Sequence, residues 1–445
     1  MSVPPDRYHA LDSLRGFAMF LGIVLHAAIS FMTVPPPFWP VRDRSPDPLA
    51  DLMLFAIHDF RMQLFFLLAG FFGCLLYLRY GARGAAWHRV KRVAVPFVLA
   101  VVFVVPTVMA AVLYAELENA RAEGAPAGAS PVRAYAAELV AARPDEGSAA
   151  IVLGQLTSGR AAALVPLVHL WFLYFLLFFY AAALLAAPLL ARLSGTRFLA
   201  ALDGAFRRVV AGRLRVAAPA LCTLPVLLTM KLPAVDTQLS WVPERHLLLY
   251  YGGFFAFGWM LYRHRDLVPA FGRRWGACLV VANAVVLPVM LAALLGGIGA
   301  VRTGGDVFPW WLGGFAAQAV YTWLMIVGLW GAFLRLFARR SAWARYLADA
   351  SYWCYLASIT PTVLFQFVVK DWPLPGLVKW VLVTVAVMAV LLASYEWCVR
   401  YTLIGAILNG RKYRCRAEGR AAEPVPAARG RGELCEPLAA EPGEG

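Results

Sequence analysis

The sequence predicts an all-α, polytopic integral membrane protein with about ten transmembrane helices. Of its 445 residues, 61% are hydrophobic, and the mean hydropathy is +0.66. Soluble domains are closer to half apolar. Apolar stretches long enough to cross a bilayer recur between residues 13 and 404. None shows the alternating pattern of a membrane β-barrel, so we expect a bundle of helices.

The first expected span is not a cleaved signal peptide, because it is too long and has Arg15 at its start. The fifth is the weakest, because Pro219 and Pro225 interrupt it. Residues 1–405 are expected to form one membrane domain, with an outer loop at about 116–165 that can carry short helices. The ten spans are expected at 13–33, 52–78, 93–115, 166–191, 216–233, 246–262, 275–299, 309–334, 346–369 and 377–404.

The distribution of basic residues predicts the orientation. If the N-terminus is cytoplasmic, 28 of the 41 Lys and Arg residues fall in cytoplasmic segments and 11 on the opposite side. Both termini are therefore expected in the cytoplasm. The net charge of +15 is scattered over short loops, which argues against a nucleic-acid partner. The segment 406–445 is rich in Glu, Arg, Ala, Gly and Pro, and we expect a disordered cytoplasmic tail.

The seven cysteines predict neither a disulfide framework nor a metal site. Five fall within expected spans and two lie in the tail, without the spacing of metal ligands. We therefore expect no metal and no bound cofactor.

Arg15 and His26 are the most informative pair of residues. They lie eleven positions apart, which on a helix is a rise of about 16.5 Å and three turns plus roughly 20°. Both side chains therefore share one face, with Arg15 near a membrane surface and His26 near the bilayer centre. An ionisable residue at that depth is costly and indicates a functional site. A histidine that only bonds a neighbouring helix is the simpler alternative.

The third expected span begins with a basic cluster. HRVKRVAVPF places Arg89, Lys91 and Arg92 just before the membrane, and Arg89 and Arg92 share a helical face. Arginines beside helix N-termini make a site suited to phosphate. Ordinary anchoring of positive residues on the cytoplasmic side explains the same pattern.

Together, these features fit an acyl coenzyme A. Its phosphorylated head would bind the arginine cluster, and its thin arm would follow the Arg15 face toward His26. His26 could then act as general base on an acceptor hydroxyl or carry the acyl group transiently.

Four segments resemble a known family. The Arg15–x10–His26 pair, FFLLAGFF at 65–72, RVKR…P at 89–96 and HLWFL at 169–173 look like membrane acyltransferase family 3. The resemblance covers about residues 7–405. It implies about ten transmembrane helices and transfer of acyl groups from cytoplasmic acyl-CoA to carbohydrates. It also implies that Arg15 and His26 carry activity, and that Arg89 and Arg92 support the donor site.

Two segments narrow the resemblance. IHDFRMQLFFLLAGFF at 57–72 and YYGGFFAFGWMLYR at 250–263 are similar to the subgroup of periplasmic-glucan succinyltransferases. One position departs from the family: Ser358 stands where many members have His. A second catalytic histidine at that position is therefore in doubt.

Further polar residues are candidates for the acceptor side. His58, Asp59 and Arg61 are expected at the outer end of the second span, where Asp59 could instead pair with Arg61 or Arg245. His169 begins the fourth span, and for it a helix-cap or interface histidine is favoured over a site role.

Other residues are expected to have structural roles. Glu396 and Arg400 are spaced for an ion pair within one helix. The small residues of helices two and six, including Gly70 and Gly258, are expected to permit close packing. An interfacial aromatic belt is expected from Trp39, Trp241, Trp310, Trp311 and Trp372, with a stacking platform for a sugar acceptor as the alternative.

The sequence thus predicts a multi-pass enzyme of a bacterial inner membrane. It would transfer a short acyl group, succinyl or acetyl, from acyl-CoA to a hydroxyl of a periplasmic or cell-surface glycan. The lipid bilayer and the carbohydrate are its other expected partners. A secondary transporter or exporter of a sugar-linked substrate is the alternative. It is less favoured, because the two halves show no convincing repeat and the arginine cluster has no purpose there.

Overall fold

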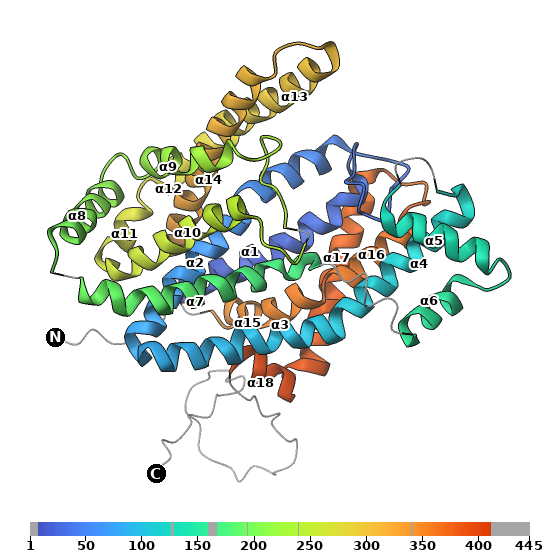
Figure 1. Cartoon of the computed structure of the whole chain (residues 1–445), viewed down its shortest axis with the longest axis horizontal. Coiled ribbons are helices and arrows are strands. Elements are labelled where there is room, and N and C mark those ends of the chain that lie inside the picture. Colours follow the sequence, from blue (N-terminus) through green and yellow to red (C-terminus); the bar gives the residue numbers. More distant parts are fainter. Residues whose placement is uncertain are drawn as a thin grey trace, which may run out of the picture.

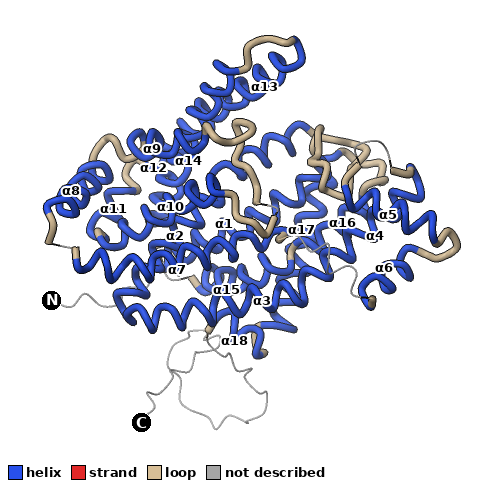
Figure 2. Tube along the Cα trace, viewed as in Figure 1, coloured by secondary structure: helices blue, strands red, loops and turns tan. Residues whose placement is uncertain are grey.

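Helix α1 (His9–Ala28) forms from the first expected span and continues as a short 3-10 turn, Ile29–Phe31. The computed structural model describes residues 8–125, 129–158, 167–193, 195–238, 240–339 and 341–410. Within these, helices and loops make up the fold and no strand is present (Figure 2). Helix α1 packs against α2, α14, α15 and α17 near the middle of the bundle (Figure 1).

The second and third expected spans form a helical hairpin. Helix α2 (Pro48–Arg89) breaks at Gly81, whose φ of 69° lies in the region that favours glycine. The chain then returns through a π-helical stretch (Val90–Ala94), α3 (Val95–Leu99), a second such stretch (Ala100–Val104) and α4 (Val105–Glu123) (Figure 1). Without this break, the helical stretch of 76 residues would be about 110 Å long, far more than one bilayer crossing.

Helix α2 packs most extensively against α10 (Arg245–Arg263), and glycines set the spacing. A Cβ on Gly70 would collide with the carbonyl of Phe255, and one on Gly258 with the carbonyl of Leu67. The two backbones therefore touch at reciprocal positions. The predicted packing role of these two glycines is confirmed.

The remaining helices complete the bundle and its edges. In Figure 1, α13 projects from one side, while α5 and α6 cover one end of the long helices. Their bounds are α5 (Pro131–Ala142), α6 (Ser148–Thr157), α7 (Trp171–Arg192), α8 (Arg197–Ala211), α9 (Ala217–Leu227), α11 (Val268–Phe271), α12 (Trp275–Val281), α13 (Leu287–Thr303), α14 (Phe308–Leu336), α15 (Ala342–Ala357), α16 (Ile359–Val369), α17 (Gly376–Ser394) and α18 (Leu403–Asn409).

The all-helical fold is confirmed, while the expectation of ten spans stays a prediction. In the described residues, six helical stretches are long and apolar enough to cross a membrane, with the hairpin Pro48–Glu123 counted once, or seven if the bent pair α15–α16 counts as one span. The fifth expected span, 216–233, contains only the 11 residues of α9. At about 16 Å this helix is too short to cross a bilayer alone. A complete fifth span therefore stays a prediction, and α9 alone does not supply it.

The ninth expected span, 346–369, is bent by 68° between α15 and α16. Pro361 lacks the N–H that would bond the carbonyl of Ala357, so the helix opens at this turn. Ser358 lies at the bend, buried, and donates a hydrogen bond to the carbonyl of Tyr355.

The two ends of the described chain meet. The first turn of α1 and the last turn of α18 line the same cavity, so the chain begins and ends at one end of the bundle. The disordered tail expected at 406–445 starts inside α18, so the prediction of disorder was wrong for residues 406–409. Residues 411–445 lie outside the described residues. The expected outer loop carries α5 and α6, with residues 126–128 and 159–166 outside the described residues.

Candidate active site

One stripe of α1 connects the two ends of the site. Arg15, Met19, Gly22 and His26 follow the spacing i, i+4, i+7 and i+11, so they lie on one face. Arg15 and Met19 line a cavity of about 320 Å³. Gly22 faces the guanidinium of Arg61, which a Cβ at this position would hit. The shared face of Arg15 and His26 therefore leads from a cavity into the interior.

The cavity at the Arg15 end, here called the arginine cavity, has basic walls. Arg15, Arg89 and Arg92 line it, together with His88 and the carboxylates of Asp12 and Asp349. Its inner half is apolar, because α1, α2 and α7 contribute Met19, Phe65, Leu68, Phe172, Leu173 and Leu176.

Arg89 is the best placed of these arginines to bind an anion. Its guanidinium stacks over the ring of Tyr180, 4.3 Å from the centroid. Tyr180 is itself fixed by a hydrogen bond of 3.1 Å to the carbonyl of Ala69. The Nε and Nη2 atoms of Arg89 are buried and form no hydrogen bond. Buried N–H donors without acceptors are costly, so an anionic ligand would be stabilised here.

The other residues predicted to bind the acyl donor differ in the contacts that they already make within the protein. Arg15 lies 3.5 Å from Asp12. Arg92 lines the cavity, but it donates to the carbonyls of Leu408 at 2.5 Å and Ile407 at 3.4 Å, near the end of α18. Lys91 points elsewhere: it is exposed and lies over the ring of Trp87. The structure thus brings Arg15, Arg89 and Arg92 together and leaves Lys91 outside the cavity.

A smaller cavity of about 220 Å³ adjoins the first and shares Arg15, Asp12, Ala348 and Asp349 with it. Arg339, Arg345 and the first turn of α15 form its other walls. Ser341 caps that turn, accepting from the N–H of Ala344 at 3.3 Å. Sequence reasoning assigned these arginines only to the orientation of the protein. No sequence signal distinguished them from other basic loop residues.

At the other end of the stripe lies a group that we call the histidine cluster: His26, His58, Arg61 and His169. Arg61, His169 and His58 are the titratable neighbours whose charges act on His26. The structure therefore brings together residues of α1 and α2 and a histidine just before α7.

His26 is held by its surroundings but keeps one free ring nitrogen. Its ring lies nearly parallel to that of Trp39, with centroids 6.2 Å apart and 17° between the planes. Trp39 is buried and donates to Ser30 Oγ and Gln366 Oε1. The Nδ1 atom of His26 is buried and has no hydrogen-bond partner. Trp39 is thus part of the site, and its assignment to an aromatic belt was wrong.

Arg61 is a buried cation without a protein counterion. Its side chain is 9% exposed, and the described residues offer it no ion pair or hydrogen bond. Asp59 does not pair with it, nor with Arg245: Asp59 Oδ1 accepts from Gln318 at 2.9 Å and from the N–H of Val235 at 3.4 Å. The possible ion pair between Asp59 and Arg61 or Arg245 was therefore wrong, because a loop and a neighbouring helix supply neutral donors instead.

The two other histidines bind backbone carbonyls. His58 Nε2 lies 2.8 Å from the carbonyl oxygen of Val235. His169 Nε2 lies 3.0 Å from that of Leu356, at the bend between α15 and α16. Tyr355 in turn donates to the carbonyl of His169 at 2.7 Å. Both histidines therefore fix neighbouring segments around His26, and Ser358 at the bend supplies no second imidazole.

An apolar layer separates the two regions. Met19, Phe65 and Phe172 line the inner part of the arginine cavity. Arg61 lies one turn from Phe65, and His169 one turn from Phe172. His26 itself does not line the cavity. A ligand arm would have to pass between these apolar side chains to reach it.

The chain belongs to the acyltransferase 3 family. A family model described as an acyltransferase domain matches residues 8–396, most of the chain, and this range contains Arg15, His26, Arg61, Arg89, Arg92 and His169. This protein is therefore a multi-pass membrane acyltransferase.

Particular relatives agree with this assignment. The chain is 25% identical over 444 residues to the glucans biosynthesis protein C of Salmonella agona strain SL483, covering 95% of this chain and 99% of the relative. The proteins of the same name from Salmonella schwarzengrund and Salmonella dublin show the same identity and coverage. No solved structure gives a significant match.

Proposed function

We propose that this acyltransferase sits in a bacterial inner membrane with both termini in the cytoplasm. In this proposal it moves a short acyl group from cytoplasmic acyl-CoA to a hydroxyl of a periplasmic or cell-surface glycan. A glucan is the favoured acceptor, because the relatives are named for glucan biosynthesis. The observation that carries the proposal is the stripe of α1 that joins the arginine cavity to the histidine cluster.

The nucleotide head of the donor would bind at the two adjoining cavities. Arg89 offers unpartnered N–H groups, and Arg15, Arg339 and Arg345 add positive charge beside the N-terminus of α15. Separate anionic groups, such as a diphosphate and a further phosphate, match basic residues spread over two cavities. The narrow arm would then continue along Met19 and Gly22.

His26 would perform the chemistry as a general base. Its unpartnered Nδ1 would accept the proton of the acceptor hydroxyl while that oxygen attacks the thioester carbonyl. The carbon–sulfur bond breaks, an ester forms, and the CoA thiolate takes up a proton to leave as thiol. Transient acylation of His26 is the alternative route, and a trapped acyl-enzyme would distinguish the two.

Arg61 would select the acyl group. A lone guanidinium beside His26 in the bundle interior lacks the counterion that buried charges normally have. A carboxylate at the far end of the acyl chain would supply it. This favours a dicarboxylic acyl group such as succinyl over acetyl.

Mass spectrometry of periplasmic glucans and surface polysaccharides tests the proposal. A deletion strain should lack one acyl substituent, and wild type should restore it while His26→Ala does not. The mass of the substituent would identify the acyl group. Unchanged glycans would overturn the glycan acceptor and favour a cytoplasmic acceptor or transport.

A further inference from the structure

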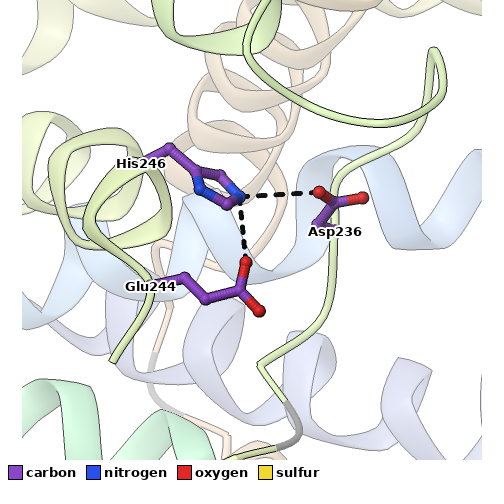
Figure 3. A group of neighbouring side chains, drawn as sticks. All are labelled: Asp236, Glu244 and His246. Carbon is purple, nitrogen blue, oxygen red and sulfur yellow. Dashed lines mark ion pairs between the residues drawn. The ribbon is translucent and has the colours of Figure 1, made fainter. Parts of the chain in front are cut away.

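A group of three potential metal ligands lies outside the site described above. Asp236 belongs to the loop that follows α9, Glu244 immediately precedes α10, and His246 is the second residue of that helix (Figure 3). In Figure 3 the two carboxylates approach the same ring nitrogen from different directions. The ligand atoms all lie within 4.8 Å of one another.

The distances from His246 Nε2 to the two carboxylates fit a tetrahedral metal site better than hydrogen bonds. His246 Nε2 lies 3.5 Å from Asp236 Oδ2 and 3.3 Å from Glu244 Oε2. Zinc binds such ligands at about 2.0–2.2 Å, so two ligands of a tetrahedron lie about 3.3–3.5 Å apart. His246 Nε2 and Asp236 Oδ2 are both buried and form no hydrogen bond.

A histidine–carboxylate pair elsewhere in the chain shows the contrast. His264 Nε2 lies 3.0 Å from Asp203 Oδ1, in hydrogen-bond geometry and with a single carboxylate. At His246, two carboxylates share one nitrogen, and neither reaches that geometry. The two like charges would also repel unless a cation lies between them.

The loop that carries the group is held in place by buried polar contacts. Gln238 is fully buried and donates to the carbonyls of Ser240 and Val242, while its Oε1 accepts from the N–H of Glu244. Val235, next to Asp236, bonds both His58 and Asp59 of α2. The ligands are thus preorganised beside the part of α2 that carries His58 and Asp59.

We propose that Asp236, Glu244 and His246 bind a divalent transition metal, with zinc as the best match. The imidazole disfavours magnesium and calcium, which prefer oxygen ligands. Three protein ligands leave a fourth position for water or a hydroxyl group. The metal would tie the loop of Asp236 to the start of α10. The residues are separated by eight and two positions, a spacing that gave no metal signal in the sequence.

The test is metal binding by the purified full-length protein in detergent, with no acyl donor present. After removal of metal with a chelator, wild type should regain about one zinc per chain by elemental analysis. Its melting temperature should rise with added zinc. His246→Gln and Asp236→Asn should lose both effects, whereas the matched control His264→Gln should keep them.

Cobalt provides a readout that needs no substitution. Co²⁺ added to the wild-type protein should give the strong visible absorption of a four-coordinate site, and zinc should abolish it. Weak octahedral bands, or zinc binding that survives His246→Gln in a correctly folded variant, would overturn the proposal. Since no acyl transfer is measured, these results are independent of the proposed function.

Discussion

The arginine cavity and the histidine cluster differ in how many positive charges they hold and in how those charges are surrounded. In the cavity, several basic residues share one space, and Arg92 is also bonded to protein carbonyls. In the cluster a single cation, Arg61, is buried without a counterion, and two of the histidines are fixed to backbone carbonyls. A many-membered basic site tolerates the loss of one member. A lone buried group does not, because nothing nearby replaces it.

The largest effect is expected at His26. His26→Ala should lower the transfer rate about 10²- to 10⁴-fold, the usual contribution of a general base. The protein should still fold, as judged by its elution volume and melting temperature. His264→Ala is the matched control and should transfer at the wild-type rate. Wild-type activity in His26→Ala would show that the histidine cluster does not contain the general base.

Arg61→Gln should impair transfer according to the acyl group. Loss of one partner of a buried charge pair costs about 2–5 kcal/mol, or roughly 30- to several-thousand-fold in kcat/KM. This loss should appear with a dicarboxylic acyl-CoA such as succinyl-CoA and be much smaller with acetyl-CoA. Equal losses with both donors would contradict carboxylate recognition and leave Arg61 with a general structural role.

Substitutions of Arg89 and Arg92 should affect donor binding and protein stability differently. Arg89→Ala removes charged hydrogen-bond donors worth about 1.5–3 kcal/mol, so KM for acyl-CoA should rise roughly ten- to a hundredfold. Arg92→Ala should raise KM less and lower the melting temperature more, because Arg92 binds the end of α18.

Lys91→Ala is the control at this site and should change neither quantity measurably. If Arg92→Ala raised KM more than Arg89→Ala, the assignment of Arg89 as the main anion ligand would be wrong.

Gly22→Ala tests the passage between the two regions. The added methyl group would push aside the Arg61 guanidinium, whose flexible end can partly adjust. We expect kcat to fall about tenfold, less than the hundredfold cost of a serious misplacement. Gly253→Ala, where the space beside α10 is open, should leave transfer unchanged. Similar activities for both variants would show that Arg61 is not positioned by α1.

The smallest effect is expected at an ion pair outside both regions. Hydrogen bonds from Arg207 lower the pKa of the Asp266 carboxyl. A lowered pKa stabilises the fold above the ordinary aspartate pKa, and this contribution is lost as the pH falls through the lowered value. Both side chains are about half exposed, so solvent screens the pair.

Asp266→Asn should therefore leave transfer unchanged and lower the melting temperature only slightly at pH 7. That difference should disappear in acid. A clear loss of transfer would show that this exposed ion pair, outside both regions, contributes to catalysis.

Sequence reasoning worked best where the relevant period is local. The apolar stretches, the shared face of Arg15 and His26, and the glycines of α2 and α10 follow from helical geometry within single segments. The Glu396–Arg400 pair is confirmed for the same reason, with distances of 2.8 Å. The effects of proline were predicted only in part. Pro219 and Pro225 indicated a weak fifth span, but the bend before Pro361 was not expected.

By itself, the sequence determined an all-helical membrane protein and a polar stripe along its first helix, because both depend on hydrophobicity and a period of 3.6 residues. Only the tertiary structure decided that Trp39 stacks on His26, that Gln318 rather than an arginine binds Asp59, and that Arg92 caps α18. It also brought Asp236 to His246. These contacts join residues from separate segments, and no local period encodes which of several possible partners a buried polar group will meet.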